Sequence, residues 1–227
     1  MLGSTFKMIR PAYLTAIPTE RQYRIEGRYK PDPKAWDLWN QALDSLQNSE
    51  DLVMLSNAFA FAKEIKYRHA GMSSEIYFMH PMRTAAFALL CEECQNIEFG
   101  IIGLLHNVFE LSDTPPERLI ETFNTDITNQ ILALTVDRDL QWDLTYKQAY
   151  YDKINSKPLS CRVVKIFDKL DNLFVLGLND NDDMRGKYLA EIRTHILPMA
   201  ERDLPSVFPY LEELVDDSEL TGFFGKI

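Results

Sequence analysis

Apolar residues recur at helical spacing along most of this chain, and this periodicity limits the folds open to it. From residue 32 onward the helical patterns follow one another, separated by short polar or proline-containing segments. Strand signals such as strict alternation, β-branched runs and Asn-Gly turns are nearly absent. No internal repeat of the roughly 20–50 residues typical of solenoids occurs. We therefore expect one all-α domain, built as a helical bundle.

Caps, prolines and apolar stripes predict where the helices lie. Two helices are expected to begin at caps: one at Asp32-Pro33, with an apolar stripe to Leu46, and one at Ser49, with an apolar stripe to Ile65. The next are expected from Pro81 to Leu89, from Ile97 to Leu111 and after a capping box at Thr114–Glu117. Further helices are expected around 127–134 and 163–174, and two more over 182–215 with a hinge at Pro205. The stretch from Arg68 to Met79 is expected to be a loop.

The first 31 residues carry mixed charge without clear periodicity, so we expect an N-terminal arm or extended lead-in at 1–31. A helical domain is expected at 32–220. Trp36 and Trp39 share the stripe of its first helix and are expected to be core residues. They can pack on their own domain or on a second subunit, which leaves a homo-oligomer open.

Composition excludes several classes of function. The 227 residues carry 24 basic and 34 acidic side chains, a net charge of −10. Such a chain repels phosphate backbones, which disfavours a general nucleic-acid or anionic-membrane binder, although a metal can still attract a phosphorylated small molecule. No segment approaches the ~20 apolar residues of a membrane span, and no secretory signal is evident. The three cysteines suit a reducing compartment, so we expect a cytoplasmic protein.

Two of the four histidines occupy positions that suggest chemistry. His80 precedes Pro81 at the expected start of a helix, and His106 interrupts an otherwise apolar one. Glu110 follows His106 by four residues and Asn107 by three, so all three can border one cavity. Burying these polar groups is costly unless they have partners.

Asp168 and Asp171 interrupt a second apolar helix and would also need a cation or donors if buried. Imidazoles and carboxylates that converge from separate helices form divalent metal sites in helical bundles. A single buried histidine is more often a satisfied core residue, and a single aspartate is usually solvated. Spacing alone therefore leaves metal binding and a structural role both open.

The order of these residues and the short sequence motifs around them resemble those of a known family, the HD-superfamily metal-dependent phosphohydrolases. The branch it is most similar to is the hydrolase domain of RelA/SpoT-type alarmone enzymes and their small stand-alone relatives. The resemblance covers about 58–178. It rests on His69-Ala-Gly71, Tyr77, His80-Pro81, His106-Asn-Val-Phe-Glu110, Asp113-Thr114, Phe123 and Val164-Lys-Ile-Phe-Asp-Lys-Leu-Asp-Asn-Leu173.

This resemblance implies an all-α, HD-domain-like bundle and a role for each matching residue. It implies a metal, commonly manganese, held by His80, His106 and Asp168 with a fourth ligand at Asn107. Glu110 would assist proton transfer, and Asn172 would contact the nucleotide. The two imidazoles and one carboxylate can hold Mn²⁺, Fe²⁺ or Zn²⁺ with open positions for water.

The chain departs from the family pattern at three points. Asn107 replaces the motif aspartate, which removes a negative charge and should weaken metal retention and water activation. This asparagine fits a natural attenuation or repurposing, and equally an engineered change that traps substrate. Leu111 replaces one member of an acidic pair. The loop between His69 and His80 is short and lacks a substrate-binding basic pair, which argues against guanosine tetraphosphate as the substrate.

Two functions remain in competition at this point. The first is a metal-dependent phosphohydrolase that cleaves a phosphoester or pyrophosphate of a nucleotide-like small molecule, because all the motif positions recur in order. The alternative is a catalytically degenerate HD-fold module that binds a nucleotide or regulates a partner. It is suggested by Asn107 and Leu111, which each replace an acidic residue that serves the same chemical step in the family.

Overall fold

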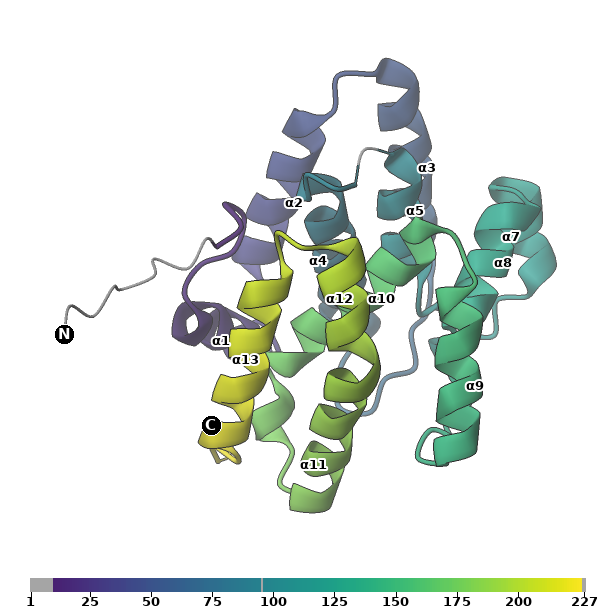
Figure 1. The fold of residues 1–227 in the computed structure, drawn as a ribbon. Helices are drawn as coiled ribbons and strands as arrows, with labels where there is room; N and C mark the ends of the chain where they lie inside the picture. The colour runs from purple at the N-terminus through teal and green to yellow at the C-terminus, as the bar shows by residue number, and fades with distance from the viewer. Residues whose placement is uncertain (1–9, 95, 226–227) are drawn as a thin grey trace.

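Helices account for all the regular structure in the part of the chain that the computed structural model describes, residues 10–94 and 96–225 (Figure 1). The all-α prediction is therefore confirmed. In chain order the elements are α1 (Ile17–Glu26), α2 (Pro33–Ser45), α3 (Ser49–Glu64), α4 (Ser74–Leu90), α5 (Ile97–Leu105), α6 (Val108–Leu111), α7 (Pro116–Thr122), α8 (Thr125–Leu134), α9 (Leu144–Asn155), α10 (Leu159–Leu173), the 3₁₀ turn η1 (Leu176–Leu178), α11 (Asp182–Glu191), the π-helical turn η2 (Ile192–Ile196), α12 (Leu197–Asp203) and α13 (Phe208–Thr221).

The centre of the bundle is formed by α4, α5 and α10. Helix α4 packs most extensively against α5 and also against α2 and α10, while α10 lies between this group and the C-terminal helices α12 and α13 (Figure 1). Gly103 permits the close approach of α5 to α4, because a Cβ atom there would lie 2.6 Å from the Cα atom of Ala85. This contact brings together the helices that carry the expected metal ligands.

Helix α2 begins where the sequence predicts. The side chain of Asp32 accepts a hydrogen bond from the backbone N–H of Lys34 and caps the helix. Trp39 is buried and stacks on Phe59 with ring centroids 5.1 Å apart, and Trp36 contacts the same ring. The tryptophans therefore pack on their own chain. The break near Pro205 is also confirmed, since it falls between α12 and α13.

Helix α4 begins seven residues before the predicted start at Pro81. Ser73 caps it by accepting a hydrogen bond from the backbone N–H of Ile76, and the expected loop ends there. His80 thus lies in the middle of a helix and not at its mouth. Pro81 lacks an N–H and removes one backbone bond, but α4 is buried on nearly every side, and this packing stabilises the helix despite the loss.

The helix expected from Ile97 to Leu111 is interrupted. Helix α5 ends at Leu105, and the short α6 begins only at Val108, so that His106 and Asn107 occupy the turn between them. The backbone of Asn107 adopts φ −104° and ψ 7°, which lies outside the helical region. His106 thus follows α5 while Glu110 lies on α6, so the two residues do not share the continuous helix face that was expected.

Two predicted caps do not form. Asn48 caps α3 in place of Ser49, because its side chain accepts from the backbone N–H of Glu50. The capping box at Thr114 does not form, since α7 starts at Pro116 without a side-chain cap. The hydroxyl of Thr114 instead accepts a hydrogen bond from Ser112. Polar side chains one or two residues away compete for the same backbone N–H groups, and this competition determines where a helix begins.

The predicted arm contains a helix. Helix α1 buries Ile17, Glu20 and Arg24, so this part of the segment is packed and not an extended lead-in. The sequence shows no apolar stripe because the buried face is largely charged, with Arg24 Nη1 3.0 Å from Glu20 Oε2. Residues 1–9 lie outside the described part, and the domain boundary at residue 31 stays a prediction. None of the described helices has the length and hydropathy needed to cross a membrane.

Candidate metal centre

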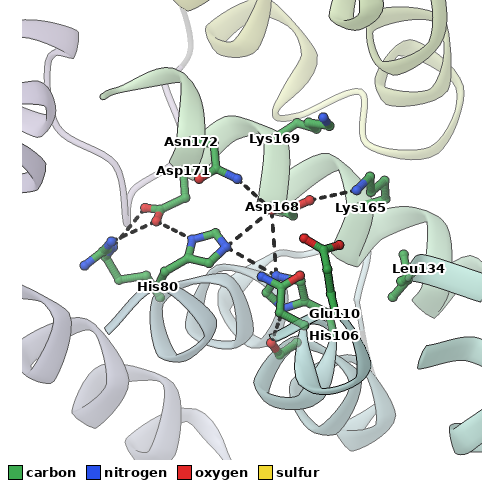
Figure 2. Close-up of polar contacts among 12 residues, drawn as sticks. His80, His106, Glu110, Leu134, Lys165, Asp168, Lys169, Asp171 and Asn172 are labelled. Carbon is green, nitrogen blue, oxygen red and sulfur yellow. Dashed lines mark hydrogen bonds and ion pairs between the residues drawn. The ribbon is translucent and has the colours of Figure 1, made fainter. Parts of the chain in front are cut away.

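Three predicted ligands from three different helical segments converge. His80 comes from α4, His106 from the end of α5 and Asp168 from α10, and Figure 2 shows the three side chains pointing toward one another. His80 Nε2 lies 3.3 Å from His106 Nε2 and 3.3 Å from Asp168 Oδ1. One ligand atom from each residue lies within 4.8 Å of the other two. This spacing suits three ligands around one ion.

Hydrogen bonds fix which imidazole nitrogen faces the cluster. His106 Nδ1 lies 2.7 Å from the Gly103 carbonyl and His80 Nδ1 lies 2.8 Å from Asp171 Oδ2, so both Nδ1 atoms are donors. Both Nε2 lone pairs are then directed at the cluster, as in histidines that ligate metals through Nε2 with an oriented Nδ1–H. The hydrogen bond to the Asp171 carboxylate also raises the basicity of the His80 imidazole.

Three acceptor atoms in such close contact need a positive charge between them. Without a cation, a proton must fill that place. Burial lowers the pKa of His80, but its hydrogen bonds to Asp168 and Asp171 outweigh this effect and raise the pKa to about 9. The donor set of two imidazoles and one carboxylate therefore fits a divalent transition-metal ion, which would replace that proton.

Asp168 is held in its ionised form. Its Oδ2 accepts a 2.9 Å bond from Lys165 Nζ, and its Oδ1 accepts a 2.8 Å bond from Asn172 Nδ2. Burial alone would raise the pKa of Asp168, but the nearby charge of Lys165 and the histidine hydrogen bonds hold it well below the usual range. Asn172, expected to contact substrate, thus supports the ligand carboxylate and also lines the adjacent cavity.

Asp171 obtains the donors that its burial requires. Arg83 contacts both its oxygens, at 2.9 and 2.8 Å, and Arg24 Nε lies 2.6 Å from Oδ1. Burial would raise the pKa of Asp171, but the two guanidinium groups lower it well below its usual value. Neither arginine could be paired with Asp171 from the sequence, because Arg24 lies 147 residues away along the chain and Arg83 lies 88 residues away.

Asn107 and Glu110 line a cavity beside the cluster. Asn107 Nδ2 donates a 2.6 Å bond to the Tyr77 hydroxyl, which leaves its Oδ1 as an acceptor. The Glu110 carboxylate forms a close ion pair with Arg138, whose side chain is 60 % exposed, and also accepts from the backbone N–H of Val136. Among the predicted site residues, only His106 does not line the cavity; its side chain is buried in the protein.

The cavity has a volume of about 540 Å³ and a positive lining. Seven basic side chains and four acidic ones line it, an excess of three positive charges in a protein of net charge −10. The basic residues are Arg24, Arg28, Arg83, Arg138, Lys147, Lys165 and Lys169, and the acidic ones are Glu110, Asp168, Asp171 and Glu191. Such a local field attracts anionic ligands despite the overall charge.

One wall of the cavity combines lysines with aromatic rings. Lys147 and Lys169 both contact Glu191, at 2.6 and 2.8 Å, and each lies 4.3 Å from the centre of a ring, that of Trp142 and Tyr188 respectively. Lys169 could have been recognised as a site residue from the sequence, because it follows Asp168 directly on an apolar helix. Lys147 and Glu191 could not, because they lie on different helices and are 44 residues apart in the sequence.

Comparison with known proteins gives a consistent result. No protein-family model matches the chain. Two curated proteins named guanosine-3′,5′-bis(diphosphate) 3′-pyrophosphohydrolase are similar: one from Borreliella burgdorferi is 23 % identical over 190 residues, which are 80 % of this chain, and one from Spiroplasma citri is 28 % identical over 140 residues, which are 58 %. The chain spans only 28 % and 18 % of their respective lengths.

The fold is shared with a solved structure of a metazoan orthologue of SpoT, described as hydrolysing ppGpp. The TM-score is 0.58 at 19 % identity, over 78 % of this chain and 99 % of that one. The chain therefore has the all-α fold of this solved structure. Its sequence is similar to a part of the two pyrophosphohydrolases.

Proposed function

We propose that this chain is a metal-dependent phosphohydrolase that cleaves a phosphoester or pyrophosphate bond of a nucleotide-like small molecule. The observation that carries the proposal is the His80, His106 and Asp168 cluster beside a positively lined cavity. The relatives are named for a nucleotide that bears diphosphate groups, which supports the same substrate class here. Three free, buried cysteines support the cytoplasm as its location.

His80, His106 and Asp168 would hold the cation, and the amide oxygen of Asn107 would complete the set. We propose Mn²⁺, with Fe²⁺ or Zn²⁺ as alternatives that the same donors accept. When bound, such an ion polarises a phosphoryl oxygen and lowers the pKa of water.

The remaining roles fall to residues around the cluster. Glu110 would accept the proton of the attacking water at its carboxylate, which faces the same space as Asp168 in Figure 2. Arg138 is largely exposed and pairs with Glu110, so that a substrate phosphate can compete for its guanidinium and free the carboxylate. Asn172 and Lys165 would keep Asp168 oriented.

Metal content and phosphate release together test the proposal. Protein purified without chelator is expected to bind one equivalent of divalent metal, and with Mn²⁺ to release phosphate or pyrophosphate from at least one member of a nucleotide panel. His106→Gln should lose the metal and the activity. His195→Gln is the matched control, because His195 is not a member of the His80, His106 and Asp168 cluster. Absence of bound metal even after incubation with Mn²⁺ would overturn the proposal.

A further inference from the structure

The chain turns back after α13 and returns to the wall of the cavity. Helix α13 ends at Thr221, and Gly222 adopts φ 62°, in the left-handed backbone region that glycine enters without a steric penalty. The backbone N–H of Phe224 then donates a 3.1 Å hydrogen bond to the carbonyl of Gly177 in the turn η1. Residues 222–225, here called the return segment, are thereby attached to η1.

The ring of Phe224 lies directly against Gly177. A Cβ atom at position 177 would be only 1.9 Å from Cε1 and 2.2 Å from Cδ1 of this ring, so the ring occupies the space that a larger residue there would need. Arg21 of α1 also contacts the ring, with its guanidinium carbon 5.6 Å from the ring centre. The same guanidinium pairs with Asp217 of α13 at 2.5 Å, which fixes the ring and α13 relative to α1.

The turn η1 forms part of the cavity wall but is weakly held by its own bonds. Leu176, Leu178 and Asn179 all line the cavity. The backbone N–H groups of Leu178 and Asn179 donate to the carbonyls of Val175 and Leu176. A 3₁₀ turn of three residues has poor hydrogen-bond geometry, so its place in the wall depends on contacts from outside. The Phe224 ring supplies such a contact.

The neighbouring ring of Phe223 supports the same turn indirectly. The guanidinium carbon of Arg185 lies 5.6 Å from the centre of this ring, and Arg185 donates a hydrogen bond to the carbonyl of Asn179. Phe223 is 42 % exposed, whereas Phe224 is half-buried against Gly177. Phe224 is therefore the aromatic residue of the return segment that contacts η1 directly.

We propose that Phe224 is a positioning residue of the site, which acts through Gly177 to hold η1 where the turn can contact the bound nucleotide. The proposal rests on the function proposed above and deepens it, because it assigns part of nucleotide binding to a segment that does not itself line the cavity. The proposed metal ligands lie on α4, on α10 and at the end of α5. Loss of the ring should therefore weaken nucleotide binding and spare metal binding.

Four variants test this role. Phe224→Ala removes the ring, and Phe224→Tyr keeps it. Gly177→Ala breaks the same contact from the other side, since its methyl group collides with the ring. Leu220→Ala is the matched control, because it shortens another apolar side chain of α13 that is 88 % exposed.

Hydrogen exchange of the full chain, measured by mass spectrometry, reports how firmly η1 is held. Exchange of the Leu178 and Asn179 amides should be about tenfold faster in Phe224→Ala and in Gly177→Ala. Phe224→Tyr and Leu220→Ala should match the wild-type protein, and exchange in α10 should be the same in all variants. Unchanged exchange of η1 in Phe224→Ala would overturn the proposal.

Nucleotide binding separates a positioning role from a contribution to stability alone. The probe is the methylene analogue of guanosine 5′-diphosphate, in which carbon bridges the two phosphorus atoms, titrated by calorimetry into Mn²⁺-loaded protein. Phe224→Ala should weaken its binding about tenfold with the Mn²⁺ affinity unchanged, whereas Phe224→Tyr should bind like the wild-type protein. The double variant Phe224→Ala/Gly177→Ala should bind no more weakly than Phe224→Ala, because both changes break one contact.

Three results of this titration would overturn the positioning role. They are wild-type affinity for the analogue in Phe224→Ala, a parallel loss of Mn²⁺ binding in that variant, and no binding of the analogue to the wild-type protein.

Phosphate release distinguishes the positioning role from the proposed activity. Phe224→Ala is expected to raise KM and to leave kcat nearly unchanged. Binding that depends on Phe224 without any release of phosphate would support the positioning role and count against the hydrolase function. Release of phosphate with a wild-type KM in Phe224→Ala would support the hydrolase function and reject the positioning role.

Discussion

His80 Nδ1 lies 2.8 Å from Asp171 Oδ2, and this bond determines that Nε2 of the imidazole faces Asp168. Asp171 is itself held by Arg83 from the same helix as His80 and by Arg24 from α1. His80, the proposed ligand on α4, is therefore oriented by α10 and by the N-terminal helix. The proposed metal centre and the packing of the bundle depend on the same buried ion pairs.

Replacing Asp171 should impair both metal binding and stability. Asp171→Asn removes the charge that pairs two buried guanidinium groups and weakens the orientation of His80, so metal affinity should fall roughly 10–100-fold and the free energy of unfolding by on the order of 3 kcal/mol. Chelator competition and denaturant unfolding measure these effects. Asp203→Asn is the control, since Asp203 pairs with Arg162 outside the cavity. Equal metal affinities in the two variants would contradict the prediction.

Metal uptake should depend on pH through His80. Its pKa is raised to about 9 in the metal-free protein, so below that pH the imidazole is protonated and a cation must displace the proton. The apparent affinity should therefore rise about tenfold per pH unit and level off near the pKa. Calorimetry at about pH 6 and about pH 8 in buffers of different ionisation enthalpy counts the released protons. An affinity that is the same at both values would count against the assignment of His80 as a ligand.

Glu191 should contribute an acid-sensitive part of the stability. Lys169 and Lys147 outweigh the effect of burial and lower the pKa of Glu191 from 4.5 to about 2. The stabilisation is complete above the unfolded value and is lost as the pH falls toward 2, with a share on the order of 3 kcal/mol. Glu191→Gln should flatten this part of the pH dependence of unfolding, whereas Glu212→Gln, an exposed change, should not.

Gly103 should be indispensable for the approach of α5 to α4. Gly103→Ala places a methyl group 2.6 Å from the Ala85 backbone, and such overpacking should cost about 1–3 kcal/mol or more. Gly186→Ala is the control, because no atom lies within 4 Å of the added Cβ, and an alanine inside α11 should be neutral or stabilise by up to ~1 kcal/mol. Thermal unfolding of both variants measures the difference. Similar melting temperatures would refute the close-packing argument.

Asn107→Asp should increase activity. The aspartate can still contact Tyr77, now as an acceptor of its hydroxyl proton, and it adds a negative charge beside the three ligands. Phosphate release in Mn²⁺ should rise about tenfold or more. Asn155→Asp serves as the control for a charge added away from the cavity. An unchanged rate in Asn107→Asp would show that position 107 takes no part in the reaction.

Local signals account for what could be predicted about the fold. Asp32 and Pro33 mark the start of α2 because a cap needs only a side chain and an N–H two residues apart. The start of α4 and the existence of α1 were missed. Both depend on burial that the rest of the bundle provides, around Pro81 in one case and around the Glu20–Arg24 pair in the other.

The sequence by itself determined the helical class and the polar residues that had to find partners in apolar helices, namely His80, His106, Asp168 and Asp171. Periodicity and the cost of burying a charge are properties of short segments, so they are legible without a structure. Only the tertiary structure decided that Arg24 and Arg83 hold Asp171 and that Lys147 and Lys169 share Glu191. Ion pairs between distant helices have no local pattern, because their geometry exists only once the helices have packed.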